Sequence, residues 1–326
     1  MKKDVIYHII NCLLLSLFVS VLLTACGGSG EDEPPLPTTR TQQDSLALLK
    51  INTGSVKWTQ TAKMDNWQGV RIRQVDGERR VVYLDLHNSQ ISGKIPAELN
   101  ELTALEYLDL SENNLSDNIP VLSALSNLQI LDLHDNDLTG ILSDNITRLQ
   151  NLTYLSLSRN LFFSDVPAGI SSLSKLVVLD LSKQKRSLSE PGFSGNLPSS
   201  WSSLKELQYL HLHENAFTGT IPQYLTTLSK MVSLTLNDNN FTGSIPEGFG
   251  QIGSLENISM RDNSLTGNIP SDLLLNPNWE RWKDQIIIQN GSNLDMNGET
   301  GSTRTSKTEE YIEYPLPDKH LFYQYK

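Results

Sequence analysis

The sequence contains almost no cysteine. Its 326 residues include two, Cys12 and Cys26, and Cys12 lies in an N-terminal apolar segment that we expect to be removed. One remaining cysteine cannot form a disulfide framework, so packing has to hold the folded chain together.

Basic residues and enzyme motifs are also scarce. Removal of the first 25 residues, which include Lys2, Lys3 and Asp4, leaves 24 Lys and Arg against 36 Asp and Glu. An acid excess argues against a nucleic-acid partner. No phosphate-binding Gly loop or nucleophile elbow is present, so the sequence predicts no catalysis and no cofactor.

What the chain does contain is a repeat of the form L-x-x-L-x-L-x-x-N-x-L/F-x-G-x-I-P. Its spacings are 24, 23, 24, 24, 31, 24 and 24 residues, a period typical of a solenoid. The first positions are Val81, Leu105, Leu128, Leu152, Leu176, Leu207, Met231 and Leu255.

The physics of one unit explains the repetition. About seven buried apolar side chains supply at most about 20 kcal/mol, whereas ordering one repeat costs about 24 to 48 kcal/mol, so the units must stack. The alternation predicts a short strand with Leu108 and Leu110 inward and Asp109 outward. An Asn ends each strand and can bond backbone groups at the turn: Asn113, Asn136, Asn160, Asn215, Asn239 and Asn263.

The template resembles the leucine-rich repeat family, specifically its plant-type subclass, which is marked by L-x-G-x-I-P after the Asn. The resemblance covers residues 81 to about 273 and implies an α/β solenoid of about eight repeats. It implies a parallel β-sheet on the concave face, an irregular or 3-10 convex side, two caps, and ligand binding on the concave face or a flank. The departures from the template, which put local turn geometry in question, are Ser89 for Asn, Asp117 and Ser164 for Gly, and Ser143 for Pro.

The start of the chain resembles a bacterial lipoprotein signal. Two lysines precede an apolar run over residues 9–23, and Leu-Thr-Ala-Cys follows, which implies export and lipid attachment at Cys26 in the outer membrane. The acidic residues 31–33 resemble the surface-export signal of some Gram-negative lipoproteins. An uncleaved membrane anchor and a plain solvated linker are the alternatives.

We therefore expect six parts: a signal peptide (1–25), the lipidated Cys with a linker (26–40), an N-terminal cap (41–80), the repeats (81–275), a C-terminal cap (276–290), and a polar linker with an aromatic tail (291–326). In the N-terminal cap, Asp44 is the expected N-cap of a helix, and Asp76-Gly77 the turn of a hairpin. The cysteines typical of this cap are replaced by Asp65 and Ile72. Trp58 and Trp67 are assigned to the cap core.

Two segments stay open in function. The fifth repeat is longer by seven residues within 184–192, next to Lys183, Lys185 and Arg186, and is either a functional loop or a neutral insertion. The tail from Tyr311 to Lys326 has five aromatic residues and either docks back on the solenoid or binds a partner.

Three columns of outward side chains follow from the register. The third position gives Tyr83, Tyr107, Ile130, Tyr154, Val178, Tyr209, Ser233 and Asn257; the fifth gives Asp85, Asp109, Asp132, Ser156, Asp180, His211, Thr235 and Ser259; the seventh gives His87, Ser111, His134, Ser158, Ser182, His213, Asn237 and Arg261. From these, with Arg159, we predict a ligand-binding face formed by Tyr83, Asp85, His87, Tyr107, Asp109, Asp132, His134, Tyr154, Arg159, Tyr209, His211 and His213.

Other interpretations of the same columns remain. Asp and Tyr suit such strands without any ligand, and the stacked carboxylates favour a basic partner or a bound cation. Ser111, His134 and Asp132 or Asp109 have the outline of a hydrolase site, and His211 with His213 lacks a third metal ligand. We predict a non-catalytic surface protein that binds a protein or peptide, with a glycan as the alternative ligand and no metal.

Overall fold

The computed structural model describes residues 39–51, 57–59, 63–184 and 192–287, which belong to one compact unit. The expected signal peptide, Cys26, most of the linker, the inserted residues 185–191 and the aromatic tail lie outside the described residues. No helix within the described ranges combines the length and apolar character that crossing a membrane requires.

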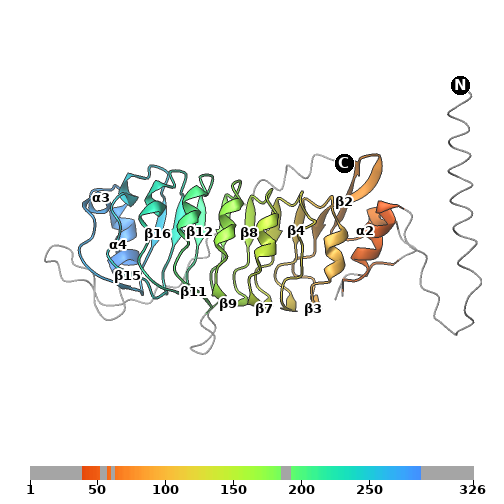
Figure 1. Cartoon of the computed structure of the whole chain (residues 1–326), viewed down its shortest axis with the longest axis horizontal. Coiled ribbons are helices and arrows are strands. Elements are labelled where there is room, and N and C mark those ends of the chain that lie inside the picture. Colours follow the sequence, from red (N-terminus) through yellow and green to blue (C-terminus); the bar gives the residue numbers. More distant parts are fainter. Residues whose placement is uncertain (1–38, 52–56, 60–62, 185–191, 288–326) are drawn as a thin grey trace, which may run out of the picture. The chain divides into compact units, whose positions relative to one another are not determined.

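Successive coils lie side by side from α2 to α4 (Figure 1). Each coil contributes one short strand to a nine-stranded sheet, which is parallel except for the antiparallel pair β1 and β2. In order the strands are β1 (Val70–Val75), β2 (Glu78–Asp85), β4 (Tyr107–Asp109), β6 (Ile130–Asp132), β8 (Tyr154–Ser156), β10 (Val178–Asp180), β12 (Tyr209–His211), β14 (Ser233–Thr235) and β16 (Asn257–Ser259).

The second half of each coil forms a smaller set of parallel strands and a 3-10 turn. A six-stranded sheet contains β3 (Ser92–Lys94), β5 (Asn114–Asp117), β7 (Asp137–Ile141), β9 (Leu161–Asp165), β11 (Phe193–Gly195) and β13 (Ala216–Phe217), and a pair contains β15 (Thr242–Gly243) and β17 (Ser264–Leu265). The 3-10 helices are η1 (Met64–Asn66), η2 (Ala97–Glu101), η3 (Asp144–Arg148), η4 (Ala168–Ser172), η5 (Ser199–Ser203), η6 (Gln223–Thr227) and η7 (Phe249–Gln251). The predicted fold class is confirmed.

In the core, each apolar position of the repeat template forms one row of side chains that runs from coil to coil. Leu108, Leu131 and Leu155 are register partners on neighbouring strands and are fully buried, as the repeat predicted. In four successive coils, beginning with that of β9, the corresponding apolar position holds Phe. Phe162, Phe193, Phe217 and Phe241 stack with ring centroids 6.0, 6.4 and 6.2 Å apart. Aromatic stacking adds to burial in this half.

The Asn side chains cross-link neighbouring coils. Asn113 Nδ2 donates to the carbonyl oxygens of Leu86, Leu110 and Ser111 at 2.8–2.9 Å. Its Oδ1 accepts from the Ile91 amide at 2.9 Å. Each buried Asn thus satisfies backbone groups of two coils.

Gln184 takes the place of Asn in the fifth coil. From the sequence we had placed Gln184 in the segment 184–192, which contains the insertion. Its Nε2 donates to the carbonyls of Leu157 and Ser182 at 2.8 and 2.9 Å, and its Oε1 accepts from the Phe162 amide at 3.1 Å. The same ladder therefore continues up to the insertion. The longer amide side chain makes the same kinds of contact.

The departures from the template keep the expected backbone. Asp117 and Ser164 adopt φ of +66° and +77°, the left-handed region that Gly occupies in other coils. Ser143, in the Pro position, accepts a hydrogen bond from the Asn145 amide at the start of η3. Local geometry is thus retained at these sites.

The N-terminal cap differs from the prediction in one respect. Helix α2 (Arg40–Leu48) begins after Thr39, which forms a capping box with Gln42, so the assignment of Asp44 as N-cap is wrong. Asp44 is instead fully buried within the helix and forms a bidentate ion pair with Arg80 at 2.9 and 3.0 Å. A long-range partner thus determines its role.

The nine-stranded sheet ends in a hairpin on one side and is followed by helices on the other. The predicted hairpin exists, with Val75 opposite Glu78 across Asp76 and Gly77. At the other end, α3 (Ser271–Leu274) and α4 (Trp279–Ile287) follow the last coil, and the Gln285 carbonyl accepts from the amides of Met260 and Arg261. Covering an edge in this way prevents strand addition.

Candidate functional site

The open face of the nine-stranded sheet is the candidate site. Third-position and fifth-position residues are register partners from strand to strand, for example Tyr83 with Tyr107 and Asp85 with Asp109. Third-position side chains form a hydrophobic cluster that is separate from the main core. This second cluster contains Tyr83, Tyr107, Ile130, Tyr154 and Val178, together with Val82 and Ala104. The predicted columns thus exist in the predicted register.

The tyrosines of this face are more buried than we expected. Tyr83, Tyr107 and Tyr154 expose 5%, 0% and 3% of their surface, and Tyr209 is half-buried. The rings of Tyr83 and Tyr107 stack at 4.2 Å, and the Arg71 guanidinium lies 4.6 Å from the Tyr83 ring. Burial, reinforced by neighbouring carboxylates, raises the pKa of all three hydroxyls, which stay protonated and donate hydrogen bonds.

The fifth-position carboxylates connect the columns on either side. Asp85 and Asp109 each accept a tyrosine hydroxyl on one oxygen, from Tyr83 at 2.9 Å and Tyr107 at 3.2 Å. Asp132 accepts the hydroxyl of Tyr154 from the next strand at 3.2 Å.

The other carboxylate oxygen binds the seventh position of its own coil. Asp109 accepts from the hydroxyl and the amide of Ser111, at 2.6 and 3.0 Å. Asp132 contacts the Nδ1 atom of His134 at 2.7 Å. Asp85 and His87 form an equivalent pair at 2.6 Å, as do Asp180 and the Ser182 hydroxyl. The face is a network of Tyr, Asp and Ser or His groups.

Stacking carboxylates in one row perturbs their ionisation. Burial, and then the charge of Asp132, raises the pKa of Asp109. Although burial acts in the opposite direction, hydrogen bonds from His87 and Tyr83 lower the pKa of Asp85. Burial also opposes the charge of His134, but Asp132 outweighs it and raises its pKa to about 9, so His134 is a cation at neutral pH.

His211, at the end of β12, and His213, two residues beyond it, lie in a different environment. His211 is almost fully buried and its Nε2 lies 3.0 Å from the Ser233 hydroxyl, whereas His213 Nδ1 lies 2.9 Å from the Thr235 hydroxyl. Burial lowers the pKa of His211 to about 3, which keeps it neutral.

Arg159 lies just outside the three columns. It stands at the position one residue before the conserved turn position of each coil, which is usually Asn. At this position Asn88 and seven charged residues have φ between +47° and +57°. The charged residues are Glu112, Asp135, Arg159, Lys183, Glu214, Asp238 and Asp262. These side chains form a charged row along the ends of the strands. Non-Gly residues in this region are uncommon, and the repeat pattern alone does not predict this backbone conformation.

Two alternative sites, a hydrolase site and a metal site, can be compared with these contacts. Ser111 donates to Asp109 and His134 pairs with Asp132, so the predicted serine and base bond to different carboxylates. Among the described residues, Asp85, His87 and Asp109 are a group whose ligand atoms lie within 4.8 Å of one another, a spacing suitable for a metal ion. His211 and His213, the histidine pair noted in the sequence, are not part of this group.

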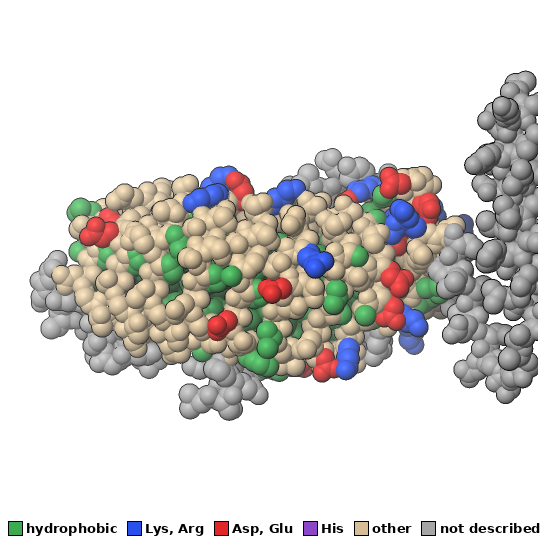
Figure 2. All heavy atoms as spheres, in the orientation of Figure 1, with side chains coloured by type: hydrophobic (Ala, Val, Ile, Leu, Met, Phe, Trp, Pro, Cys, Tyr) green, Lys and Arg blue, Asp and Glu red, His purple; other side chains and the backbone are tan. Residues whose placement is uncertain are grey.

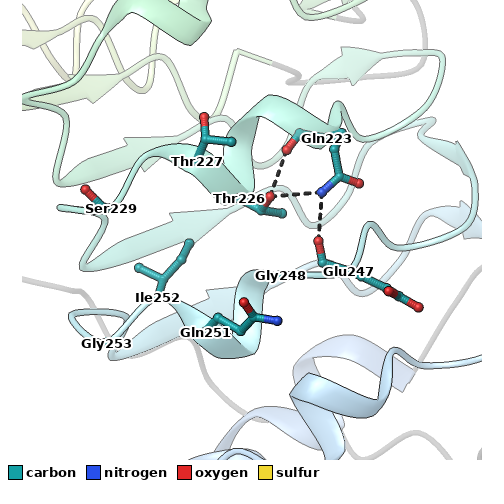
Figure 3. Close-up of a pocket in the computed structure, with 9 residues that line it drawn as sticks. All are labelled: Gln223, Thr226, Thr227, Ser229, Glu247, Gly248, Gln251, Ile252 and Gly253. Carbon is teal, nitrogen blue, oxygen red and sulfur yellow. Dashed lines mark hydrogen bonds between the residues drawn. The ribbon is translucent and has the colours of Figure 1, made fainter.

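A hollow of the described surface lies elsewhere, between η6 and η7 (Figure 3). It has a volume of about 600 Å³ and is lined by polar groups of Gln223, Thr226 and Glu247 and by Gly248 and Gly253. The Gln223 Nε2 atom donates to the Glu247 carbonyl at 2.8 Å. Because these groups bond one another across an open groove, no chemistry is indicated there.

Most of the surface seen in Figure 2 is backbone or side chains that are neither apolar nor charged, with scattered apolar and charged residues between them. On the six-stranded sheet, Ile141 and Phe163 are register partners and remain exposed. A pair of this size is normal for a protein surface.

Comparisons with known proteins agree on the repeats. Two family models, both described as leucine rich repeat, match residues 126–185 and residues 80–102, 104–125, 206–228 and 230–252. The receptor-like kinase TMK4 of Arabidopsis thaliana is 30% identical over 96 residues, which are 28% of this chain and 10% of that protein.

Solved structures share the fold. The repeat ectodomain of the receptor kinase GASSHO1/SCHENGEN3 of Arabidopsis thaliana, solved in complex with CASPARIAN STRIP INTEGRITY FACTOR 2, is 25% identical with a TM-score of 0.60, over 71% of this chain and 31% of that chain. A plant ice-binding protein is 23% identical with a TM-score of 0.59, over 71% of this chain and 82% of that chain. Most of the receptor's length thus has no counterpart here.

Proposed function

We propose that this leucine-rich-repeat solenoid is a non-catalytic recognition module that binds a protein or peptide through the face formed by β2 to β10. The observation that carries the proposal is the network of Tyr, Asp and His on this face. Side chains held by such contacts are pre-organised, which reduces the entropy lost on binding.

The exposed members of the face supply the contacts in this proposal. His87, Glu112 and Asp135 are exposed, and His134 and Arg159 are half-buried at the same rim. The acidic row beneath them favours a ligand with basic groups. The likeness to a receptor ectodomain solved with a bound partner supports the same class of ligand.

A glycan is the less favoured ligand. A glycan would be expected to stack on the tyrosines, but the rings of Tyr107 and Tyr154 are buried among their neighbours. Stacking on a sugar needs an accessible ring face. The proposal therefore keeps a protein or peptide as the ligand.

The test is capture of partners from cell-surface extracts by the mature chain and by Glu112→Lys/Asp135→Lys. Lys183 and Arg159 occupy the same backbone position in other coils, so lysine suits this conformation. Glu101→Lys/Asp144→Lys, exposed on η2 and η3, makes the same charge change away from the face.

We expect the wild type and the control variant to retain one partner that the face variant loses. Retention by all three proteins would place binding elsewhere. Turnover of the captured material, abolished by Ser111→Ala, would contradict the non-catalytic assignment.

We further propose that the module is exported and anchored in the outer membrane through lipid on Cys26, exposed at the cell surface. The support is the basic start, apolar run and Leu-Thr-Ala-Cys of the sequence. Intact-mass measurement of the membrane-extracted chain should show loss of residues 1–25 and added acyl mass, both absent in Cys26→Ser. An unprocessed N-terminus would favour the uncleaved anchor instead.

A further inference from the structure

The first two coils bring together three side chains of types that bind metal ions. Asp85 and His87 belong to the coil of β2, and Asp109 is the register partner of Asp85 on β4. One ligand atom of each residue lies within 4.8 Å of the ligand atoms of the other two. Three convergent carboxylate and imidazole ligands leave the fourth position of a tetrahedral site open.

We propose that Asp85, His87 and Asp109 form a binding site for a divalent transition-metal ion of the zinc class. The sequence alone predicts no metal, because the pair His211 and His213 lacks a third ligand. In the first coils, a neighbouring strand supplies the third ligand. Metal binding at this site does not depend on the proposed recognition function, since no protein partner is involved.

Asp109 is a buried carboxylate without a cationic partner. It exposes 4% of its surface, and within the described ranges no Lys, Arg or His side chain forms an ion pair with it. Its hydrogen bonds to Tyr107 and Ser111 come from neutral donors. Buried charges in proteins are normally paired or coordinate a metal ion. A cation held between the two strands would therefore supply the charge that this carboxylate lacks.

Neighbouring hydrogen bonds orient the two carboxylates and leave them acceptor capacity. Asp85 accepts from the Tyr83 hydroxyl at 2.9 Å and from the His87 amide at 3.3 Å, and it contacts the His87 ring at 2.6 Å. A carboxylate has about four acceptor positions, so three contacts at Asp85, and three at Asp109, leave about one position each. Hydrogen-bonded partners of this kind hold the ligands of metal sites in place.

His87 gives the site both access and selectivity. The His87 side chain is 55% exposed and that of Asp85 is 18% exposed, so an ion can enter from solvent. The ligand atoms of a tetrahedral zinc site lie about 3.4 Å apart, and rotation of the exposed imidazole can bring the three residues to this spacing. Imidazole suits zinc, copper and nickel, whereas Ca²⁺ and Mg²⁺ prefer oxygen ligands.

The third coil shows what the site requires. Asp132 and His134 repeat the Asp-x-His arrangement, with the ring nitrogen 2.7 Å from the carboxylate. The register partner of Asp132 on the next strand is Ser156, so the second carboxylate is missing there. Asp109, on the preceding strand, does not complete such a group with them among the described residues. The combination of Asp-x-His with an Asp on the next strand therefore distinguishes the first coil.

The test is isothermal titration of Zn²⁺ into the mature chain without a polyhistidine tag, carrying Cys26→Ser to remove a competing thiol. His87→Gln deletes the ligand at an exposed position, where folding should be unaffected. Asp109→Ser deletes the second carboxylate and gives this position the residue type of Ser156. The matched control is His134→Gln, which removes the histidine of the equivalent pair. Thermal unfolding with and without Zn²⁺ provides a second measurement for each protein.

We expect the wild type to bind one Zn²⁺ that His87→Gln and Asp109→Ser bind at least about tenfold more weakly, since even indirect partners of metal ligands contribute about tenfold or more. Zn²⁺ should raise the Tm of the wild type and of His134→Gln equally, and should raise the Tm of the two ligand variants less. Because His87 is exposed, its variant decides the test even if Asp109→Ser does not fold.

Three results would overturn the proposal. The first is a wild type that binds no Zn²⁺, and the second is an affinity that His87→Gln leaves unchanged. The third is Ca²⁺ binding as tight as Zn²⁺ binding, which would show that the carboxylates act without the imidazole. No partner is present in these titrations, so each of these results leaves the recognition function untouched, and failure to capture a partner leaves the metal site untouched.

Discussion

The first coils of the solenoid and the last coils have the same backbone and different outer faces. From β2 to β10, four of the five fifth-position residues are Asp; from β12 to β16, the equivalents are His211, Thr235 and Ser259. Parallel pairing continues across this change, and Leu179 is the register partner of Leu210. The Asn ladder continues as well, through Gln184 and Asn215.

This comparison bears on whether the acidic column is a scaffold requirement. In the first coils, each Asp caps the amide two residues later, as Asp109 does for Ser111. The last coils form the same strands in the same register without a carboxylate there. The fold therefore does not need a carboxylate at this position.

The largest predicted loss of stability concerns the core of the last coils, which differs from that of the first coils in its row of Phe side chains. Phe217→Ala removes a fully buried ring that stacks on Phe193 and Phe241, and we expect a loss of about 3–5 kcal/mol in the free energy of unfolding. Urea unfolding measures the loss. Phe217→Leu, which restores the residue type of the first coils, should recover much of it; equal losses for both variants would show that the stack depends on the ring itself.

Lowering the pH should reduce the free energy of unfolding, mainly in the last coils, through protonation of His211. Its folded pKa is lowered to about 3, so below pH 6.5 the unfolded chain takes up a proton that the folded chain excludes. Stability is therefore lost as the pH falls, by about 2.5 kcal/mol between pH 7 and 4.5. His211→Gln should remove this part of the pH dependence in urea unfolding, whereas His87→Gln, at an exposed position, should not. Identical pH profiles for wild type and His211→Gln would contradict the assignment.

Raising the pH should reduce the free energy of unfolding of the first coils through deprotonation of His134. Its folded pKa is raised to about 9 by Asp132, so its contribution is complete below pH 6.5 and is lost as the pH rises through about 9. Allowing for solvent screening at a side chain that is 18% exposed, we expect about 2 kcal/mol. Unfolding at pH 7 and 9.5 measures it, and His134→Gln should abolish the difference between the two pH values. If it does not, another group is responsible.

The repeat period was sufficient to predict the sheet, the order of its strands and the columns of its face, because a solenoid has contacts only between neighbouring coils. Gln184 was missed because its role depends on position in the coil rather than on residue type. Asp44 was misassigned because a buried Arg80 36 residues later decides its environment. The depth of burial of Tyr107 was equally out of reach, since burial depends on packing above the strand, which periodicity does not describe.

The smallest prediction concerns a turn at the boundary of the two regions. Ser164 has φ of +77°, at a position that holds Gly195 and Gly219 in later coils. An L-residue in this conformation costs about 1–2 kcal/mol, and Gly costs about 0.5–1 kcal/mol in entropy, so Ser164→Gly should stabilise the fold by about 0.5–1 kcal/mol in urea unfolding. Gly219→Ala is the matched reverse change, and it should destabilise because the added Cβ would lie 2.3 Å from the Asn196 Oδ1 atom. A destabilising Ser164→Gly would mean that the serine side chain makes a contact worth more than the backbone strain, and that the first coils depend on this turn in a way that the last coils do not.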